Sequence, residues 1–225
     1  MLFAVATIKP WNVAQFHRRV PEFPGEWRLL ETPAALEAFA ASERPRYIFF
    51  PHWSWRVPAA LLNQHNCVCF HMTDLPFGRG GSPLQNLIAT GRRETKISAL
   101  RMVEELDAGD IYLKRPLDLS GSAQQIYERA AGIVYEMIGE MARTDPAPIP
   151  QLGEVTTFHR RRPEQSLLPD SGELGRLYDH IRMLDAETYP HAFVEHGEFR
   201  LEFSDAELED GRLSAKVTMS RRPQR

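Results

Sequence analysis

The 225-residue chain is 43% hydrophobic and 25% charged, and its formal net charge is −3, which suits an ordinary globular protein. This slightly acidic balance argues against a nucleic-acid binder, which usually carries a basic surplus. The sequence has no apolar run near the roughly 20 residues that span a bilayer, and its first residues lack the pattern of a signal peptide. We therefore expect a cytoplasmic protein that does not bind a membrane.

Apolar runs that alternate with helical patterns predict an α/β fold of three layers around a mostly parallel, Rossmann-like sheet. The runs with strand character are 2–6, 27–30, 47–50, 67–71, 95–103 and 110–113, and the predicted helices are 12–20, 33–42, 58–64 and 83–90. Thr32 before Pro33 is typical of a helix start, and Ser122 with Gln125 has the spacing of a capping box. The latter predicts a long helix with an apolar stripe through residue 141.

Three prolines between residues 146 and 150 predict a stiff connector. Beyond it lie a helical segment, 174–184, and two strand-like runs, 199–203 and 213–219. We therefore predict a catalytic domain over 1–145, a linker over 146–165 and a small α+β appendage over 166–225. Strand edges in that appendage can pair with a second copy, so a homodimer is one expectation.

A histidine and an aspartate stand where this fold places ligands. His71 ends the predicted strand 67–71, and ligands of open parallel sheets bind at the carboxyl ends of strands. Asp107 precedes the predicted strand 110–113, and Gly109 permits a tight backbone after it. A carboxylate fixes the tautomer of an imidazole and raises its basicity, so the pair can move protons between an attacking amine and a leaving group. The alternative is a structural histidine.

A metal site is another interpretation, because five potential ligands fall within twenty residues: His52, His65, Cys67, Cys69 and His71. Structural zinc sites, however, separate paired cysteines by two to four residues, whereas one residue separates these two. Buried free cysteine is common in apolar strands. We therefore expect no metal and no disulfide, and a nucleophilic Cys69 would need His71 as its base.

Two motifs resemble the folate-dependent formyltransferases, a family that includes glycinamide ribonucleotide, methionyl-tRNA and sugar N-formyltransferases. HMTDLPFGRGGSP (71–83) resembles the family's H-x-S-x-L-P…R-G…P signature, and ELDAGDI (105–111) resembles its D-x-G-x-I segment. FHRRRPEQS and LYDHIRMLDAETYPHAFVEHG resemble segments after the catalytic domain of sugar N-formyltransferases. FPHWSW (50–55) and FHMTDLPFGRGGSPLQNLI (70–88) are most similar to the branch tied to pseudaminic-acid-type sugars. The resemblance implies the formyltransferase fold, 10-formyltetrahydrofolate as cofactor and a nucleotide-linked amino sugar as substrate, in pseudaminic-acid-type or surface-polysaccharide synthesis.

The same resemblance assigns His71 and Asp107 as catalytic residues. Cys69 takes the position of the family's catalytic asparagine, and a thiol is a poor substitute for an amide at a developing oxyanion. A missing donor there costs about 10²–10³ in rate, so Asn66, Asn86 and backbone N–H groups of the glycine loop are alternative donors.

The remaining site predictions divide into two groups. The predicted folate-binding residues are Trp53, Leu75, Pro76, Arg101, Leu106 and Gly109, and the predicted substrate-binding residues are Arg79, Gly80, Gly81, Ser82 and His52. The alternatives are a core role for Trp53 and a solvated loop charge for Arg79. A methionyl-tRNA formyltransferase-like enzyme is the first alternative function, although we expect it to carry a larger C-terminal domain and a basic surface. A metal-dependent or non-catalytic relative is the second.

Overall fold

The computed structural model describes residues 1–187 and 189–222. The chain forms two compact units, each built from separate segments. The first comprises Met1–Gly80, Thr95–Leu117 and Tyr127–Thr157, and the second comprises Gly81–Glu94, Asp118–Ile126 and Phe158–Arg225. Each unit therefore combines segments from different parts of the sequence. The predicted domains, 1–145 and 166–225 with a linker between them, are instead continuous segments, and this division of the chain stays a prediction.

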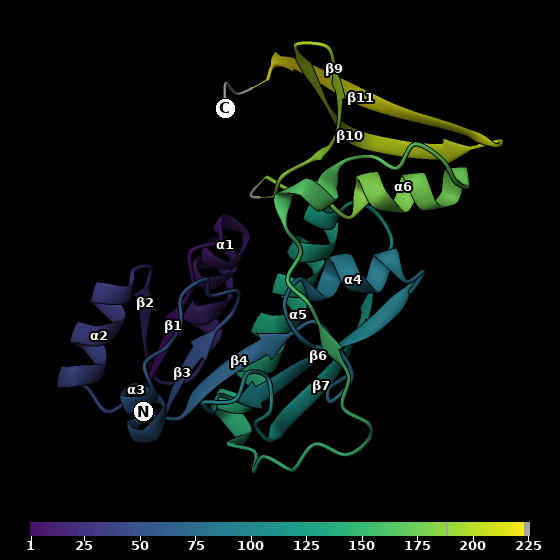
Figure 1. Cartoon of the computed structure of the whole chain (residues 1–225). Helices are drawn as coiled ribbons and strands as arrows, with labels where there is room; N and C mark the ends of the chain where they lie inside the picture. Colours follow the sequence, from purple (N-terminus) through teal and green to yellow (C-terminus); the bar gives the residue numbers. More distant parts are fainter. Residues whose placement is uncertain (188, 223–225) are drawn as a thin grey trace. The chain divides into compact units, whose positions relative to one another are not determined.

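A six-stranded sheet forms the framework of the first unit (Figure 1). Its strands are β1 (Leu2–Ala6), β2 (Glu26–Leu30), β3 (Tyr47–Phe50), β4 (Cys67–His71), β6 (Glu94–Arg101) and β7 (Ile111–Asp118), in the order β2-β1-β3-β4-β6-β7. The four strands β1 to β4 run parallel, and β6 is antiparallel to β4. The predicted α/β class and mostly parallel sheet are therefore confirmed. The predicted strand 110–113 was too short, because Lys114, Arg115 and Pro116 interrupt the apolar pattern while the backbone of β7 continues.

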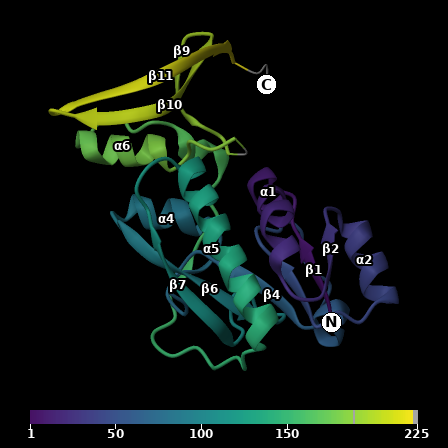
Figure 2. The same ribbon diagram turned by 180° about the vertical axis from the view of Figure 1, so that it is seen from behind.

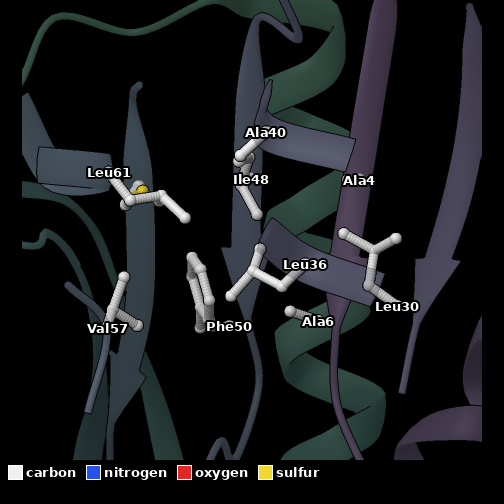
Figure 3. Packing of buried hydrophobic residues seen from close by; sticks show 10 residues of the cluster. Ala4, Ala6, Leu30, Leu36, Ala40, Ile48, Phe50, Val57 and Leu61 are labelled. Atoms are coloured by element: carbon white, nitrogen blue, oxygen red, sulfur yellow. The ribbon is translucent and has the colours of Figure 1, made fainter. Parts of the chain in front are cut away.

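Helices cover both faces of this sheet. On one face, Leu36 and Ala40 of α2 (Pro33–Ser42) and Leu61 of α3 (Ala59–Gln64) pack against Ile48 and Phe50 (Figure 3). On the other face lie α1 (Pro10–Arg19), the 3₁₀ turn η1 (Val20–Glu22) and α5 (Ala123–Thr144), as the view from behind shows (Figure 2). These are the three layers that the sequence predicts.

Local sequence signals explain where these helices begin. The side chain of Thr32 accepts a hydrogen bond from the N–H of Ala35 at 3.1 Å, as an N-cap does. Ser122 and Gln125 form the reciprocal capping-box bonds, at 3.0 and 3.3 Å. Each cap satisfies N–H groups that the first turn of a helix leaves without partners.

The second unit contains a three-stranded antiparallel sheet of order β11-β10-β9. Its elements are α4 (Pro83–Ala89), η2 (Pro163–Ser166), α6 (Leu174–Arg182), β9 (Ala192–His196), β10 (Phe199–Glu209) and β11 (Arg212–Arg221). Asp210 and Gly211 both have positive φ, 48° and 72°, which is the conformation of a tight hairpin turn. No strand was predicted at the position of β9. Within residues 1–187 and 189–222, the helices are too short or too polar to cross a membrane.

Candidate functional site

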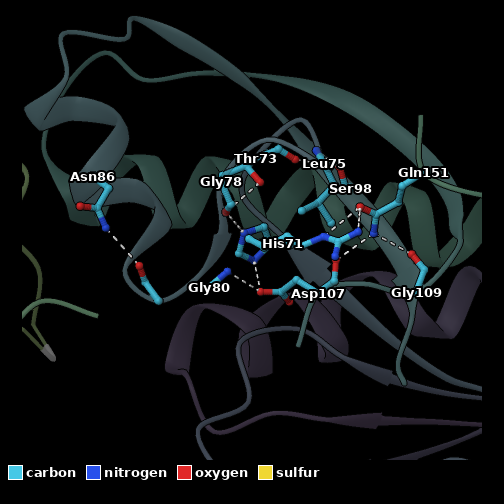
Figure 4. A network of polar contacts seen from close by, with 12 residues as sticks. His71, Thr73, Leu75, Gly78, Gly80, Asn86, Ser98, Asp107, Gly109 and Gln151 are labelled. Atoms are coloured by element: carbon cyan, nitrogen blue, oxygen red, sulfur yellow. Dashed lines mark hydrogen bonds and ion pairs between the residues drawn. The ribbon is translucent and has the colours of Figure 1, made fainter. Parts of the chain in front are cut away.

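The carboxyl end of β4 places the imidazole of His71 between two oxygen acceptors (Figure 4). Its Nε2 lies 2.7 Å from the carbonyl oxygen of Gly78, so this nitrogen carries a hydrogen and donates it. Its Nδ1 lies 3.5 Å from Oδ2 of Asp107. The side chains of His71 and Asp107 are each only 9% exposed. The ring is therefore oriented from both sides.

The loop that follows His71 is held by hydroxyl groups. The hydroxyl of Ser98 on β6 donates to the carbonyl oxygen of Thr73 at 2.7 Å and accepts from the N–H of Leu75 at 3.3 Å. The N–H of Gly78 donates to the hydroxyl of Thr156 at 2.7 Å. Residues from two distant segments thus fix the loop that presents the Gly78 carbonyl to His71.

Asp107 is held by backbone and side-chain donors. Its Oδ2 accepts a 2.9 Å hydrogen bond from the N–H of Gly80, and its backbone has a positive φ of 55°. The amide Nε2 of Gln151 donates to the carbonyl oxygens of Asp107 and Gly109, both at 2.8 Å. A Cβ at Gly109 would lie 1.8 Å from the carbonyl oxygen of Arg101, so only glycine fits there. The left-handed conformation of Asp107 therefore rests on contacts from three segments.

Arg79 connects the two loops instead of projecting freely into solvent. Its guanidinium donates to Oε1 of Gln151 at 2.9 and 3.3 Å and pairs with Glu105 at 3.1 Å. Gln151 thereby joins Arg79 to the backbone of Asp107. The sequence motifs do not indicate Gln151 or Thr156, since both lie in the predicted linker 146–165 and neither belongs to a local motif.

A pocket of about 540 Å³ opens beside the His71–Asp107 pair. Most of its wall is aromatic or aliphatic: Phe50, Trp53, Trp55, Val57, Leu62, Leu100, Met102, Val103 and Leu106. Its polar lining includes His52, Arg101, His71 and Asp107. An apolar body with a few convergent polar groups is the usual form of a small-molecule site.

The structure brings some of the predicted site residues together and not others. The residues that line the pocket are His71, Asp107, Cys69, Trp53, Arg101, Leu106 and His52. Leu75 is buried against Leu100 and Ile111, and the carbonyl oxygen of Pro76 accepts from the N–H of Thr156. Leu75, Pro76, Gly109, Arg79 and Gly80 therefore support the site without lining its pocket.

Two of the predicted substrate-binding residues, Gly81 and Ser82, belong to the second unit. The N–H of Gly81 donates to the carbonyl oxygen of Phe158 at 3.2 Å, and the hydroxyl of Ser82 accepts from the N–H of Arg161 at 3.0 Å. Both residues thus take part in local contacts of that unit.

Cys69 stands in the pocket wall as a neutral side chain. Burial, together with the nearby carboxylate of Asp107, raises the pKa of its thiol. A protonated, buried thiol is a weak donor and a poor nucleophile. The alternative donors are engaged outside the pocket: Asn66 donates to the carbonyl of Arg46, and Asn86 donates to three carbonyl groups of the second unit. Among residues 1–187 and 189–222, no three His, Cys, Asp or Glu side chains cluster as metal ligands.

His52 forms one wall of the pocket in an unusual conformation. Its φ is +60°, and its ring meets the edges of Trp11 and Tyr127, with centroid distances of 5.7 and 5.2 Å. Burial, with a smaller contribution from the positive charge of Lys9, lowers the pKa of His52 to about 4. At neutral pH this ring is uncharged, and it contributes shape instead of charge to the pocket wall.

Comparison with known proteins adds a family relationship. Residues 163–220 match the family model for the C-terminal domain of methionyl-tRNA formyltransferase. A methionyl-tRNA formyltransferase from Halalkalibacterium halodurans is 30% identical over 191 residues, which are 80% of this chain and 59% of that protein. The chain spans little more than half the length of the curated relatives that it matches.

Solved structures extend the match to the whole chain. A methionyl-tRNA formyltransferase from Clostridium thermocellum is 43% identical, with a TM-score of 0.92 over 98% of this chain and 99% of that one. HypX from Aquifex aeolicus in complex with tetrahydrofolic acid is 18% identical, with a TM-score of 0.75 over 92% and 38%. A likely sugar N-formyltransferase from Mycobacterium tuberculosis is also 18% identical, with a TM-score of 0.69 over 100% and 99%. At 18% identity these last two show a shared fold.

Proposed function

Because the chain belongs to the formyltransferase family, we propose that its His71–Asp107 site transfers a formyl group from 10-formyltetrahydrofolate to a primary amine. The observation that carries the proposal is the 3.5 Å contact between His71 and Asp107 in the wall of a 540 Å³ pocket. HypX has the same fold, and its structure is a complex with tetrahydrofolic acid, which supports a folate as the donor here.

The pocket suits a folate in size and in chemistry. Its volume falls within the range of about 300–1,000 Å³ typical of small-molecule sites. Phe50, Trp53 and Leu62 offer apolar and aromatic surface for a flat heteroaromatic ring, and His71 and Asp107 supply the polar end. When bound, 10-formyltetrahydrofolate supplies the formyl group and leaves as tetrahydrofolate.

His71 and Asp107 then have distinct roles. For the reaction, Nε2–H of His71 turns from the carbonyl oxygen of Gly78 toward the formyl oxygen and neutralises the negative charge that develops there. The ring then moves a proton from the attacking amine toward the leaving nitrogen. Asp107, fixed by the N–H of Gly80, stabilises the positive charge that the ring carries during this step. Cys69, as a neutral thiol, limits the space beside them.

For the amine, methionyl-tRNA is the first candidate. The structure that matches at 43% identity over nearly its full length bears that enzyme's title, and the tail matches the C-terminal domain of the same family. A nucleotide-linked amino sugar, which the sequence resemblance favoured, is the second candidate. It is supported by the net charge of −3 and by the acidic side chains of β10, since both oppose the phosphate backbone of a tRNA.

The test supplies the purified chain with 10-formyltetrahydrofolate and, separately, methionyl-tRNA or a panel of nucleotide-linked amino sugars. Formylated product is measured by mass spectrometry, together with released tetrahydrofolate. We expect His71→Gln and Asp107→Asn each to lower kcat about 10²–10⁴-fold, as loss of proton transfer does. His17→Gln, at an exposed histidine of α1, is the matched control and should keep the wild-type rate. A wild-type chain that formylates none of these amines, or a His71→Gln variant of unchanged rate, would disprove the proposal.

A further inference from the structure

We propose that a second, basic pocket of the first unit binds the carboxylates of a polyglutamyl tail on the folate donor. This inference rests on the proposed function, because it concerns the donor of the same site. The pocket has a volume of about 230 Å³ and is lined mainly by Arg44, Asn63, Gln64, His65, Asn66 and Arg101. Nothing in the sequence motifs points to it.

The lining has the chemistry of an anion site. It contains two guanidinium groups and three side-chain amides, and no carboxylate. Guanidinium groups bind carboxylates through two parallel N–H···O bonds, which adds geometric selectivity to charge attraction. Within residues 1–187 and 189–222, the side chain of Arg101 makes no hydrogen bond or ion pair. Its donors are therefore available to a ligand.

The opposite wall of this pocket is held in place. Arg44 donates through Nη1 to the carbonyl oxygens of Ala40 and Glu43, at 3.3 and 2.9 Å. Nε2 of the buried His65 lies 3.1 Å from the same carbonyl of Ala40, and Asn66 donates to the carbonyl of Arg46. These bonds fix the stem of Arg44 and use only one of its guanidinium nitrogens.

The basic pocket and the proposed folate pocket share one lining residue and border the same helix. Arg101 lines both, and α3 borders both, because Leu62 faces the larger pocket while Asn63 and Gln64 face the smaller. Asn66 and His71 lie at opposite ends of β4, about 16 Å apart at about 3.3 Å per residue. Each γ-linked glutamate adds a carboxylate and lengthens the tail, so a polyglutamyl chain that passes Arg101 reaches this lining.

Inorganic phosphate presents similar anionic oxygens, so it is the alternative ligand for the basic pocket. Arg101 lines both pockets, and this favours the folate tail over phosphate as the ligand. Binding of free phosphate does not require a site beside the donor pocket. The two sources differ in what they predict for binding of folates that differ only in tail length.

The experiment measures the dissociation constants of monoglutamyl and triglutamyl forms of a stable 10-formyl folate analogue by calorimetry. The variants are Arg101→Gln, Arg44→Gln and the double variant, and Arg18→Gln is the matched control, because Arg18 is an exposed arginine of α1 outside both linings. We expect the wild type to bind the triglutamyl form about tenfold more tightly, from two charge-assisted contacts. The preference should shrink as salt rises and disappear in the double variant. Arg44→Gln alone should weaken triglutamate binding and keep monoglutamate binding within twofold, because Arg44 lines only the smaller pocket.

The other outcomes separate the two proposals. Equal affinities of the wild type for both tail lengths would overturn the polyglutamate site and leave the proposed function intact. Arginine-dependent binding of phosphate without a preference for the longer tail would also overturn it. No binding of either folate form would overturn the proposed function and, with it, this inference.

Discussion

Gln151 and Asp107 are separated by 44 positions, yet the side-chain amide of Gln151 donates a 2.8 Å hydrogen bond to the carbonyl oxygen of Asp107. The same amide nitrogen also donates to the carbonyl oxygen of Gly109, and Oε1 of Gln151 accepts from the guanidinium of Arg79. One side chain therefore holds the backbone of the proposed catalytic carboxylate and joins it to the loop after His71.

We expect Gln151→Ala to lower kcat about 10–10²-fold with little change in the KM for the folate, because it releases Asp107 without altering the pocket lining. Steady-state kinetics and the pH profile of kcat measure the effect. Gln151→Glu should resemble the alanine variant, since a carboxylate cannot donate to the two carbonyls. Gln15→Ala on α1 serves as control. A Gln151→Ala enzyme with wild-type kcat would contradict the positioning role.

Gly109 and Gly132 form a matched pair for a stability test. A Cβ at Gly109 would lie 1.8 Å from the carbonyl oxygen of Arg101, whereas a Cβ at Gly132, on α5, has no atom within 4 Å. Gly109→Ala should therefore reduce the free energy of unfolding by about 1–3 kcal/mol through overpacking. Gly132→Ala should raise it by about 0.5–1 kcal/mol through helix propensity. Urea unfolding measures both, and equal effects of the two substitutions would refute the steric argument.

His52 should make the protein less stable in mild acid. Its pKa is lowered from 6.5 to about 4 in the folded chain, so the unfolded chain binds a proton first as the pH falls. The stabilising contribution is complete above about pH 6.5 and is lost as the pH falls toward 4. We expect a loss on the order of 1–2 kcal/mol, reduced by partial exposure of the ring.

The variant that isolates this effect is His52→Asn, because asparagine tolerates the positive φ at this position. Guanidinium unfolding between pH 4 and 7 should show a shallower decline for the variant than for the wild type. Parallel curves would mean that other groups cause the pH dependence.

Both cysteines should resist alkylation in the folded state. Burial raises the pKa of Cys67 to about 12, and it also raises the pKa of the Cys69 thiol. At pH 8 the reactive thiolate is then scarcer by about 10²–10³-fold than in an unfolded chain. Mass spectrometry after iodoacetamide treatment, with and without urea, tests this. Rapid labelling of Cys69 in the folded protein would revive a nucleophilic role for it.

Much of the first unit could be predicted because its signals are local. Residues 2–6, 47–50 and 67–71 are short apolar runs that are largely buried in the sheet, and the structure has strands at those positions. Thr32 and Pro33 marked the start of α2. By contrast, β9 is a five-residue strand whose stability comes from pairing with β10, and no local pattern sets it apart.

The candidate site divides in the same way. The sequence motifs identified His71 and Asp107, which the structure has 3.5 Å apart. The fold rule for strand ends accounts for His71 at the end of β4. Because β6 is antiparallel to β4, Asp107 instead reaches His71 through the loop between β6 and β7. Their roles in catalysis stay predictions. Gln151 and Thr156 could not be foreseen, because their importance depends on where the chain returns after α5 and not on the residues beside them.

Gln151 and Thr156 lie in the segment after α5, and their late position in the sequence affects the order in which the chain can fold. All six strands of the large sheet, and α5 as well, leave the ribosome before Gln151 and Thr156 do. A nascent chain can thus complete its sheet while the backbone of Asp107 and the N–H of Gly78 still lack their partners. Pairing of the six strands can therefore precede the contacts that hold the backbone of Asp107 and the loop after His71.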